Sequence, residues 1–496
     1  MTTNAPLAAG VKPRRGIARR RSVFVALLFV VAHVAGFLAS VQAVMSVRTA
    51  QGAIAWVVSL NTLPWVAVPA YVLFGRSKFE GFVSLRRRGL EETSVQAKKF
   101  RDGLAEQDLI AGFDSDQAHL IEKLAKLPFT LSNDVDLLVD GQAKFDSLFA
   151  GIERAERYVL VQYYILRDDD IGSELKRRLI ERADAGVRCH VLYDEVGTSD
   201  LPDAYVEELR AAGVEVRTFD TRRGPIDRLL QINFRNHRKI VVVDGREAWV
   251  GGFNVGDEYL GRDAKFGHWR DTAVRVAGPV VQSVQVSFVE DWHWATGKIL
   301  DLEWRPVAAS KASDGAVLAL PSGPADQLET ATLFFMHAIS RARTRLWIAT
   351  PYFVPDEQFV TALQLAALRG VDVRILVPEK SDSRLVNLSV WSYLADLERV
   401  GVRSFRHGKG FMHQKVMLVD DRLATVGTAN FDNRSFRLNF EITMVVVADQ
   451  DFARDVAQML ERDFADSREV FAKELQQRGL WFRVAVRAAR LMAPLQ

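Results

Sequence analysis

Two copies of one motif hold the residues in this sequence that are best suited to chemistry. Each copy reads His-x-Lys, four apolar residues and Asp, and after six further residues comes Gly-x-x-Asn. The ionisable residues of the two copies are His237, Lys239, Asp244, His413, Lys415 and Asp420. Because the whole pattern recurs at one constant spacing, chance is excluded, and these residues form the candidate catalytic set.

The residue types suit the binding of a phosphoryl group. Histidine and lysine two positions apart lie on the same face of a β-strand, because side chains alternate between faces. The glycines let a ligand approach the backbone closely, and Asn254 and Asn430 supply amide donors beside it. If two such halves face each other, lysines and asparagines can bind the non-bridging oxygens while the histidines lie on the line of attack and departure.

Two histidines allow a division of labour. One attacks phosphorus to form a phosphohistidine intermediate, and the other protonates the leaving oxygen and then deprotonates the incoming alcohol. The nucleophile must be neutral, so a carboxylate is expected on its other ring nitrogen. Asp271 and Glu441 each enter a strand after a motif and are predicted to orient the histidines.

The aspartates of the motifs allow a second interpretation. For Asp244 and Asp420, a structural ion pair at the end of the strand fits the pattern at least as well as a chemical role. Neither motif clusters carboxylates or spaces histidines as metal ligands do, so no metal site is predicted.

The strands that must position the motifs also come in two copies. The matching apolar segments are 155–165 with 344–353, and 185–195 with 369–379. Helix-period segments alternate with them, which predicts two α/β units, each with a largely parallel sheet, and a site in the cleft between the units. We assign 135–310 to the first domain and 311–496 to the second, after a linker at 76–134 without recognisable chemistry.

Two long uncharged segments precede the duplicated part. Residues 22–47 and 49–75 are separated only by Arg48, and each is longer than the roughly 20 residues that cross a bilayer. They predict a two-helix transmembrane hairpin whose second helix is kinked by its prolines. A cleaved signal peptide is the alternative for the first segment. Basic residues in the tail at 1–21 and directly after residue 75 place both ends of the hairpin, and the domains, in the cytoplasm.

The composition excludes other classes of protein. Hydrophobic residues make up 48% of the 496 residues, which excludes a disordered chain. The net charge of +3 speaks against a dedicated nucleic-acid binder. Cys189 is the single cysteine, so neither an internal disulfide nor a thiolate metal cluster is possible.

The C-terminal segment is basic and amphipathic. After Glu474 the chain has no acidic residue, and Arg483, Arg487 and Arg490 fall along one helical stripe beside apolar residues. This pattern is typical of an interfacial helix attracted to anionic lipid. A terminal helix packed on its domain, with the arginines in water, fits almost as well.

With its paired motifs the sequence resembles the phospholipase D superfamily, and within it the bacterial cardiolipin synthases with two membrane spans. The resemblance covers nearly the whole chain, and its most specific parts are 251–272, 350–357 and 427–441. It implies two tandem phospholipase D-like α/β sandwich domains, with the active site between them, attached to the bacterial inner membrane by the hairpin.

The resemblance also implies an activity. One phosphatidylglycerol gives its phosphatidyl group to a histidine, glycerol leaves, and a second phosphatidylglycerol takes the group to give cardiolipin. Phosphatidylglycerol and other anionic phospholipids are the implied partners, and no cofactor is implied. The nucleophile of the superfamily is generally the histidine of the first motif, which carries over to His237. One departure is Gly252, where many members have serine, and we expect the first half to rely on backbone N–H groups instead.

Three other functions are compatible with such motifs. A phospholipase D would resolve the same intermediate with water, and the residues alone do not separate hydrolysis from transfer. The net charge of +3 and the membrane segments speak against a nuclease of the superfamily. The two intact motifs speak against a degenerate scaffold protein.

Overall fold

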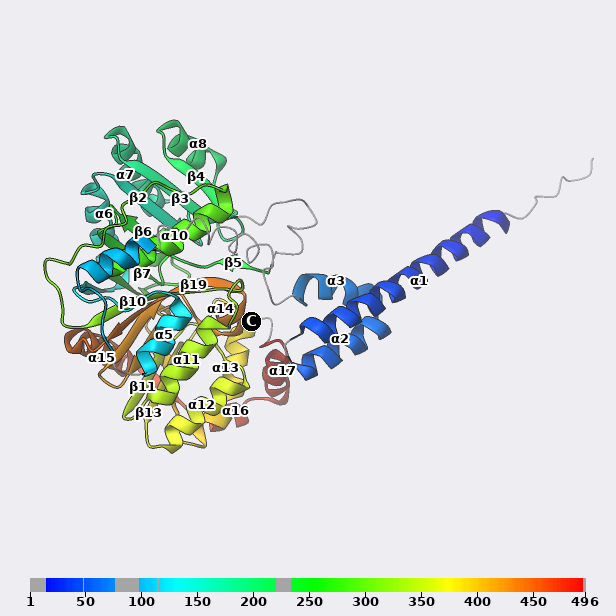
Figure 1. Cartoon of the computed structure of the whole chain (residues 1–496). Coiled ribbons are helices and arrows are strands. Elements are labelled where there is room, and N and C mark those ends of the chain that lie inside the picture. The colour runs from blue at the N-terminus through cyan, green and yellow to red at the C-terminus, as the bar shows by residue number, and fades with distance from the viewer. Residues whose placement is uncertain (1–14, 48, 76–97, 114–115, 220–232, 494–496) are drawn as a thin grey trace, which may run out of the picture. The chain divides into compact units, whose positions relative to one another are not determined.

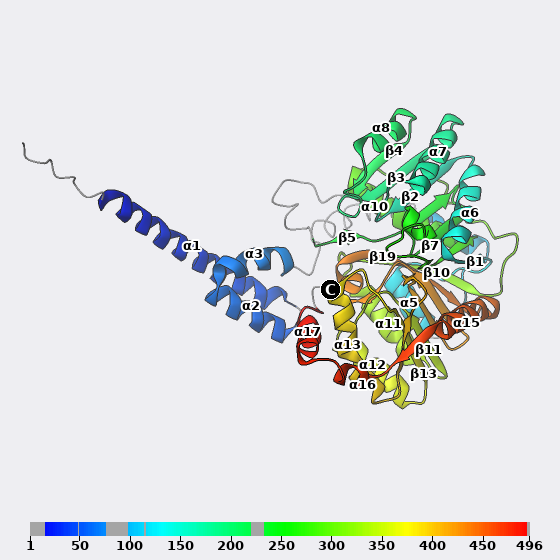
Figure 2. The ribbon, with the colours of Figure 1, turned by 180° about the vertical axis from the view of Figure 1, so that it is seen from behind.

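The computed structural model describes residues 15–47, 49–75, 98–113, 116–219 and 233–493 (Figures 1 and 2). These residues fall into two compact units. The N-terminal helices form one unit, and almost all of the remaining chain forms the other, which we call the catalytic body. The predicted basic tail lies largely outside the described residues, as does the basic segment after residue 75.

The N-terminal unit consists of three apolar helices. These are α1 (Arg15–Ser46), α2 (Ala50–Thr62) and α3 (Pro64–Phe74). Within the described part of the chain, only α1 is long and apolar enough to cross a membrane, over Val23–Ser46. The predicted second span is divided at Leu63, because Pro64 has no N–H to continue α2 and instead begins α3. The prolines therefore do more than kink this segment.

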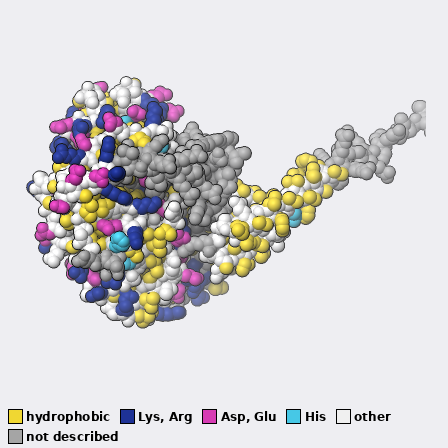
Figure 3. All heavy atoms as spheres, viewed as in Figure 1, with side chains coloured by type: hydrophobic (Ala, Val, Ile, Leu, Met, Phe, Trp, Pro, Cys, Tyr) yellow, Lys and Arg dark blue, Asp and Glu magenta, His cyan; other side chains and the backbone are white. Residues whose placement is uncertain are grey.

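The three helices pack on one another. Asn61 on α2 donates a hydrogen bond to the hydroxyl of Ser40 on α1 at 2.7 Å. A Cβ atom at Gly36 would lie 2.2 Å from the carbonyl oxygen of Leu60, so glycine permits this close approach. From Val23 onward, most large side chains of α1 are exposed and apolar, and hydrophobic side chains are spread along the face of this unit that Figure 3 shows. A surface of this composition suits lipid rather than water.

The catalytic body contains two sheets with matching strand orders. The first is β1-β9-β7-β6-β2-β3-β4, and the second is β10-β19-β17-β16-β11-β13-β14-β20 with β5 paired to β19. The first comprises β1 (Asp134–Val139), β2 (Tyr158–Tyr163), β3 (Arg188–Asp194), β4 (Glu215–Phe219), β6 (Ile240–Val243), β7 (Glu247–Gly251) and β9 (Thr272–Ala277). The second comprises β5 (Arg235–Asn236), β10 (Ala316–Ser322), β11 (Arg345–Ala349), β13 (Asp372–Pro378), β14 (Arg403–His407), β16 (Val416–Val419), β17 (Leu423–Gly427), β19 (Asn439–Val447) and β20 (Ser467–Val470). The order confirms the duplication inferred from sequence.

The prediction of largely parallel sheets is wrong, because most neighbouring strands in both sheets are antiparallel. The strands β2, β3 and β4 are parallel, but β6 runs antiparallel to β2 and forms a hairpin with β7. The same arrangement recurs at β16, which is antiparallel to both β11 and β17. The hairpins β6–β7 and β16–β17 follow from the motif, because its aspartate lies in a tight turn that reverses the chain.

Helices cover the outer faces of both sheets. Those of the first half are α6 (Asp140–Glu153), α7 (Asp170–Asp184) and α8 (Asp203–Ala211), and those of the second are α11 (Thr330–Arg341), α12 (Glu357–Leu368) and α13 (Arg384–Glu398). The inner faces of the two sheets share one core with α10 (Val280–Thr296) and α15 (Gln450–Ala465). Strand β2 shows the alternation clearly, since Tyr158 and Leu160 face this shared core while Val159 and Val161 face the outer helices.

Part of the predicted linker belongs to the catalytic body. The helix α5 (Asp116–Ala125) packs against β10, and Thr130 and Val317 pair as an isolated β-bridge. Phe100, Leu104 and Phe129 are fully buried in the outer core of the second sheet. From residue 98 onward, the described residues of this segment therefore stabilise the second half rather than merely connecting two parts.

Candidate active site

Each motif histidine is held by a strand of the opposite half. The strand β5 precedes His237 and pairs with β19 of the second half, while β15 (Phe411–Met412) precedes His413 and pairs with β8 (Trp269–Arg270) of the first half. The backbone N–H of His237 donates to the carbonyl of Phe440 at 2.9 Å. The backbone N–H of His413 donates to the carbonyl of Arg270 at 2.8 Å. These exchanged pairings bring the two motifs together.

Each of the two carboxylates predicted to orient a histidine contacts the histidine of the opposite half. Glu441 of the second half lies 2.9 Å from Nδ1 of His237 in the first half. Asp271 of the first half lies 2.9 Å from Nδ1 of His413 in the second half. Both carboxylates are fully buried. Each ring therefore has Nδ1 engaged by a carboxylate, and this leaves Nε2 for chemistry.

Both imidazole rings line one cavity of about 430 Å³. Burial lowers the pKa of His237 to about 4, against the opposing effect of Glu441. Burial and the ammonium group of Lys415 lower the pKa of His413 well below its ordinary value. Without a bound anion, both rings are consequently neutral near pH 7, as a nucleophilic imidazole must be.

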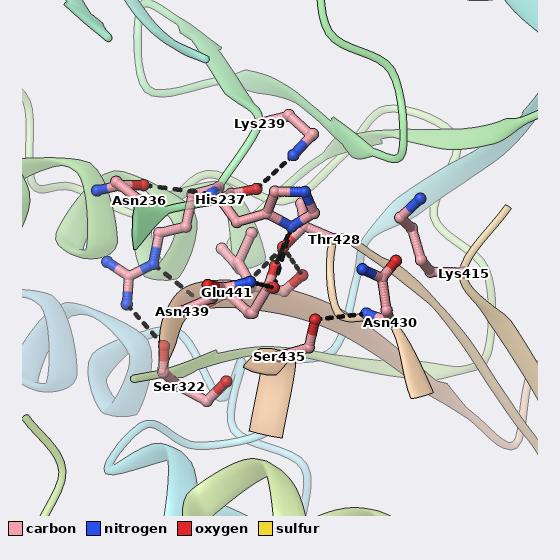
Figure 4. A network of polar contacts seen from close by, with 12 residues as sticks. Asn236, His237, Lys239, Ser322, Lys415, Thr428, Asn430, Ser435, Asn439 and Glu441 are labelled. Carbon is pink, nitrogen blue, oxygen red and sulfur yellow. Dashed lines mark hydrogen bonds and ion pairs between the residues drawn. The ribbon is translucent and has the colours of Figure 1, made fainter. Parts of the chain in front are cut away.

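The two lysines lie directly behind the histidines. Lys239 is buried, and its ammonium donates to the carbonyl of His237 at 2.6 Å, as Figure 4 shows. The ammonium of Lys415 likewise donates to the carbonyl of His413. Burial lowers the pKa of Lys239 to about 7 and that of Lys415 to about 8, although Glu441 and Asp271 act in the opposite direction. To bind a phosphate oxygen, each ammonium must exchange a main-chain carbonyl for that oxygen.

The two asparagines line the cavity but have different partners. The side chain of Asn254 accepts a hydrogen bond from the N–H of Ile165 at 3.1 Å and donates one to Tyr259 at 2.7 Å. Within the described residues, Oδ1 of Asn430 is buried without a hydrogen-bond partner. A half-turn of the Asn430 amide would put its NH₂ group where the unpaired oxygen now lies, and that group could donate to a phosphate oxygen. Both ends of the Asn254 amide are already hydrogen-bonded, so Asn430 is the better placed of the two.

The structure does not bring Asp244 and Asp420 to the cavity. The Asp244 carboxylate accepts hydrogen bonds from the N–H groups of Glu156, Arg157 and Tyr158 at 2.8 to 2.9 Å, where β2 begins. Asp420 accepts the equivalent bonds before β11. Both aspartates have φ above 50°, in the hairpin turn after the motif strand. Their place in the candidate catalytic set is therefore corrected to a structural one, and their partners are backbone amides rather than a charged side chain.

An Asp244→Asn variant is expected to lose about 1–3 kcal/mol of unfolding free energy while the folded protein keeps its turnover. Asparagine tolerates the positive φ, but its NH₂ group would face the N–H of Glu156 in place of an acceptor. Thermal unfolding and specific activity should be measured beside Asp451→Asn, which changes an exposed aspartate on α15. Unchanged unfolding together with lost turnover would contradict the structural role.

The expectation for Gly252 is also corrected. A Cβ atom at this position would lie 2.1 Å from the Asp271 carboxylate, so any side chain would displace the partner of His413. The N–H of Gly252 donates to the carbonyl of Thr272 at 3.0 Å, and so it is not available to a phosphate. In the second half, the hydroxyl of Thr428 donates to Glu441 at 2.6 Å. At this position of the second motif, the Thr428 hydroxyl therefore binds the carboxylate that orients His237, not the phosphate.

The carboxyl groups of the two histidine–carboxylate pairs differ in pKa. Burial raises the pKa of Asp271 to about 6. Burial acts on Glu441 in the same direction, but His237, Lys239 and the Thr428 hydroxyl outweigh it and hold the pKa of Glu441 below its ordinary value. An ionised carboxylate on Nδ1 makes Nε2 the more nucleophilic ring nitrogen. Glu441 therefore stays ionised over a wider pH range than Asp271, and this difference favours His237 as the attacking group.

Several cavity residues were not found from the sequence. Arg235 and Arg434 line the cavity, and each guanidinium lies near enough to Tyr164 to lower that phenol's pKa, although burial and Asp194 raise it overall. The His237 ring packs against Tyr164, and the His413 ring packs against Trp269 and Phe411. The sequence held a signal for these neighbours. Arg235 lies two residues before His237, whereas Phe411 lies two residues before His413. Both histidines thus have aromatic neighbours, and the cavity is lined by arginines and by the carboxylates of Glu258, Asp382 and Asp432.

The arrangement suits anion chemistry more than metal binding. Among the residues that the structure describes, no group of three or more His, Cys, Asp or Glu side chains is placed to hold a metal ion. Two imidazoles in one cavity, two ammonium groups behind them and the nearby guanidinium groups of Arg235 and Arg434 can bind a phosphodiester and transfer protons at either end of it.

The chain is similar to known proteins over almost its whole length. A cardiolipin synthase A of Pseudomonas fluorescens strain Pf-5 is 46% identical over 474 residues, which cover 94% of this chain and 98% of that protein. A cardiolipin synthase A of Pseudomonas entomophila is 45% identical over 468 residues, covering 93% and 96% of the two chains. The solved structure of phosphatidylserine synthase from Haemophilus influenzae Rd KW20 has a TM-score of 0.59 at 16% identity. It covers 77% of this chain and 100% of that chain, which supports the fold.

A family model agrees with these similarities. The model described as "Cardiolipin synthase, PLD-like domain" matches residues 148–292 and 335–465, and each matched range contains one motif. The two ranges correspond to the two halves of the duplicated catalytic body. The chain belongs to the cardiolipin synthase family of proteins with phospholipase D-like domains.

Proposed function

We propose that this protein transfers a phosphatidyl group from one phosphatidylglycerol to a second, giving cardiolipin and glycerol. The observation that carries the proposal is the pair of carboxylate-bound histidines that line one cavity, in a chain of this family. Arg235 and Arg434, which line the cavity, suit the phosphate groups of phosphatidylglycerol and other anionic phospholipids as substrates.

In the first step, Nε2 of His237 attacks the phosphorus of the donor lipid. The bond from phosphorus to the glycerol oxygen breaks, and His413 gives its proton to that oxygen, so that glycerol leaves neutral. The negative charge of the bound phosphodiester raises the pKa of His413, because a nearby opposite charge favours the imidazolium. The phosphatidyl group is then bound to His237 as a phosphoramidate.

In the second step, the neutral His413 removes a proton from a glycerol hydroxyl of the acceptor lipid. The oxygen attacks phosphorus, the bond from phosphorus to His237 breaks, and cardiolipin forms. Lys239, Lys415 and Asn430 stabilise the charge that develops on the non-bridging oxygens in both steps. If water took the acceptor's place, the same intermediate would give phosphatidic acid.

Lys239→Ala and Lys415→Ala are each expected to lower turnover by about 10²-fold or more, because the ammonium charge at the phosphate is lost. Initial rates in mixed micelles of detergent and phosphatidylglycerol provide the measurement. The exposed Lys409, which pairs with Asp466, supplies a matched Lys409→Ala control that should remain active. A loss below tenfold in both motif variants would remove the lysines from the mechanism.

We further propose that the protein is a multi-pass protein of the bacterial inner membrane with its catalytic body in the cytoplasm. Two features support this location: the exposed apolar surface of α1, α2 and α3, and the basic residues at 1–21 and after residue 75. A lipid substrate supports it too, because an anchored enzyme meets its substrate by diffusion within the leaflet.

Product analysis tests the proposed function. The purified full chain in detergent is incubated with phosphatidylglycerol and EDTA, with His237→Ala as the blank, and the lipid and water-soluble products are identified. Cardiolipin with an equal amount of glycerol is the expected result. Phosphatidic acid as the main product would assign a phospholipase D instead, and dependence on an added metal ion would exclude the histidine mechanism.

A further inference from the structure

The helix α17 (Leu480–Leu491) is a folded part of the catalytic body. Val486 and Ala489 on one face of α17 are buried, and the helix packs on α13. Arg490 forms an ion pair with Asp396 of α13 at 3.2 Å. These contacts fix which face of α17 points away from the body.

The opposite face of α17 is apolar and open to solvent. Trp481 and Leu491 are 82% and 81% exposed. The large apolar side chains exposed on this face, or just beyond its last residue, are Leu480, Trp481, Val484, Leu491 and Met492. We call them the α17 apolar face. Exposure of a contiguous apolar surface to water is unfavourable, so such a surface marks a contact.

Positive charge borders the α17 apolar face. Arg483 and Arg487 are both exposed, and at helical spacing they fall between the apolar face and the buried face. No acidic residue follows Glu474 to offset them. A helix with an apolar face, an exposed tryptophan and flanking arginines has the composition of helices that lie in the interface of an anionic bilayer.

The position of α17 suits a lipid surface that also delivers substrate. The helix α13, on which α17 packs, begins two residues after Asp382, and Asp382 lines the active-site cavity. In both views, α17 and the strand β5 that leads to His237 lie at the same side of the catalytic body (Figures 1 and 2). A bilayer in contact with α17 would therefore lie beside the helix α13, whose start is two residues from the cavity residue Asp382.

We propose that the α17 apolar face docks on an anionic lipid leaflet and is a membrane contact of the catalytic body in addition to the N-terminal helices. The arginines select anionic lipid, and the apolar side chains enter the boundary between headgroups and acyl chains. This contact is separate from the chemistry, so it can hold whether or not the proposed transfer reaction is correct.

A fluorescent probe on α17 tests the proposal in the full chain. Cys189 is buried, so a cysteine introduced as Val484→Cys can be labelled selectively with an environment-sensitive dye. The protein is reconstituted in phosphatidylcholine vesicles with and without phosphatidylglycerol, and a portion of the lipid carries a nitroxide quencher on its acyl chain. We expect quenching in the vesicles with phosphatidylglycerol, and far less quenching without it.

Matched variants identify the cause of any quenching. A dye at Asp451→Cys, which is exposed on α15, should not be quenched in either vesicle. Adding Arg483→Gln or Arg487→Gln to the Val484→Cys protein should lower the docking equilibrium by roughly fivefold for each arginine. The proposal is overturned if the dye at 484 is quenched no more than the dye at 451. It is also overturned if the dye's emission changes only as the protein concentration rises and the nitroxide lipid does not quench it. That result would assign the α17 apolar face to contact with a second copy of the chain.

Discussion

His237→Ala and His413→Ala variants are each expected to lose net cardiolipin synthesis by roughly 10³-fold or more. Without His237 no covalent intermediate can form, and without His413 neither the departing glycerol nor the incoming hydroxyl exchanges its proton. The two losses should be similar in size although the histidines have different roles, because the cycle needs both steps. Initial rates of cardiolipin formation by the purified variants provide the measurement.

Two controls separate lost chemistry from lost structure. His337 lies half-buried on α11, away from the cavity residues, so His337→Ala should remain active. Unfolding temperatures should also be compared, because each motif histidine is paired with a buried carboxylate that would lose its partner. Substantial synthesis by either motif variant would refute the two-histidine mechanism.

Much of the site could be predicted from the sequence because its signals are local. The spacing of His237 and Lys239, repeated at His413 and Lys415, marks both motifs, although the structure places these residues just before β6 and β16 rather than within a strand. The matching strand orders of the two sheets follow from the same duplication. Asp271 and Glu441 were found for the same reason, since each stands near the start of the strand that follows its motif.

The partners of these carboxylates could not be predicted, because they depend on pairing between the halves. Glu441 contacts His237 only because β5 pairs with β19, and Asp271 contacts His413 only because β15 pairs with β8. These are pairings of two residues each, too short to leave a periodic signal in the sequence. The role of Gly252 could not be predicted either. A side chain at this position would collide with the carboxylate of Asp271, and the sequence does not show that these two residues touch.

The aspartates and the second apolar segment show a different limit. A strand-end aspartate can form an ion pair, contact substrate or bind backbone amides, and only the three N–H groups before β2 decide among these roles for Asp244. Similarly, Pro64 can kink one helix or begin another, and its effect depends on the packing of α2 and α3 on α1.

The covalent intermediate is expected on His237, and a substrate with a reactive leaving group can trap it. A phosphatidyl ester of nitrophenol, labelled in its phosphorus, needs no proton on the departing oxygen. A His413→Ala variant should therefore still form the intermediate from this ester, but it should not pass the group to an acceptor alcohol, because the base of the second step is missing. A His237→Ala variant should incorporate no label at all.

The electrostatics of the two pairs give the reason for this expectation. The Thr428 hydroxyl, together with His237 and Lys239, holds the pKa of Glu441 below its ordinary value, whereas Asp271 lies against Gly252 and has a pKa raised by burial to about 6. Glu441 therefore stays ionised over the wider pH range. The labelled protein should be quenched in denaturant and mapped at alkaline pH, where phosphoramidates survive, and the label should lie on the peptide containing His237. Label on the His413 peptide of the unmodified enzyme would exchange the two roles, while the requirement for both histidines would stand.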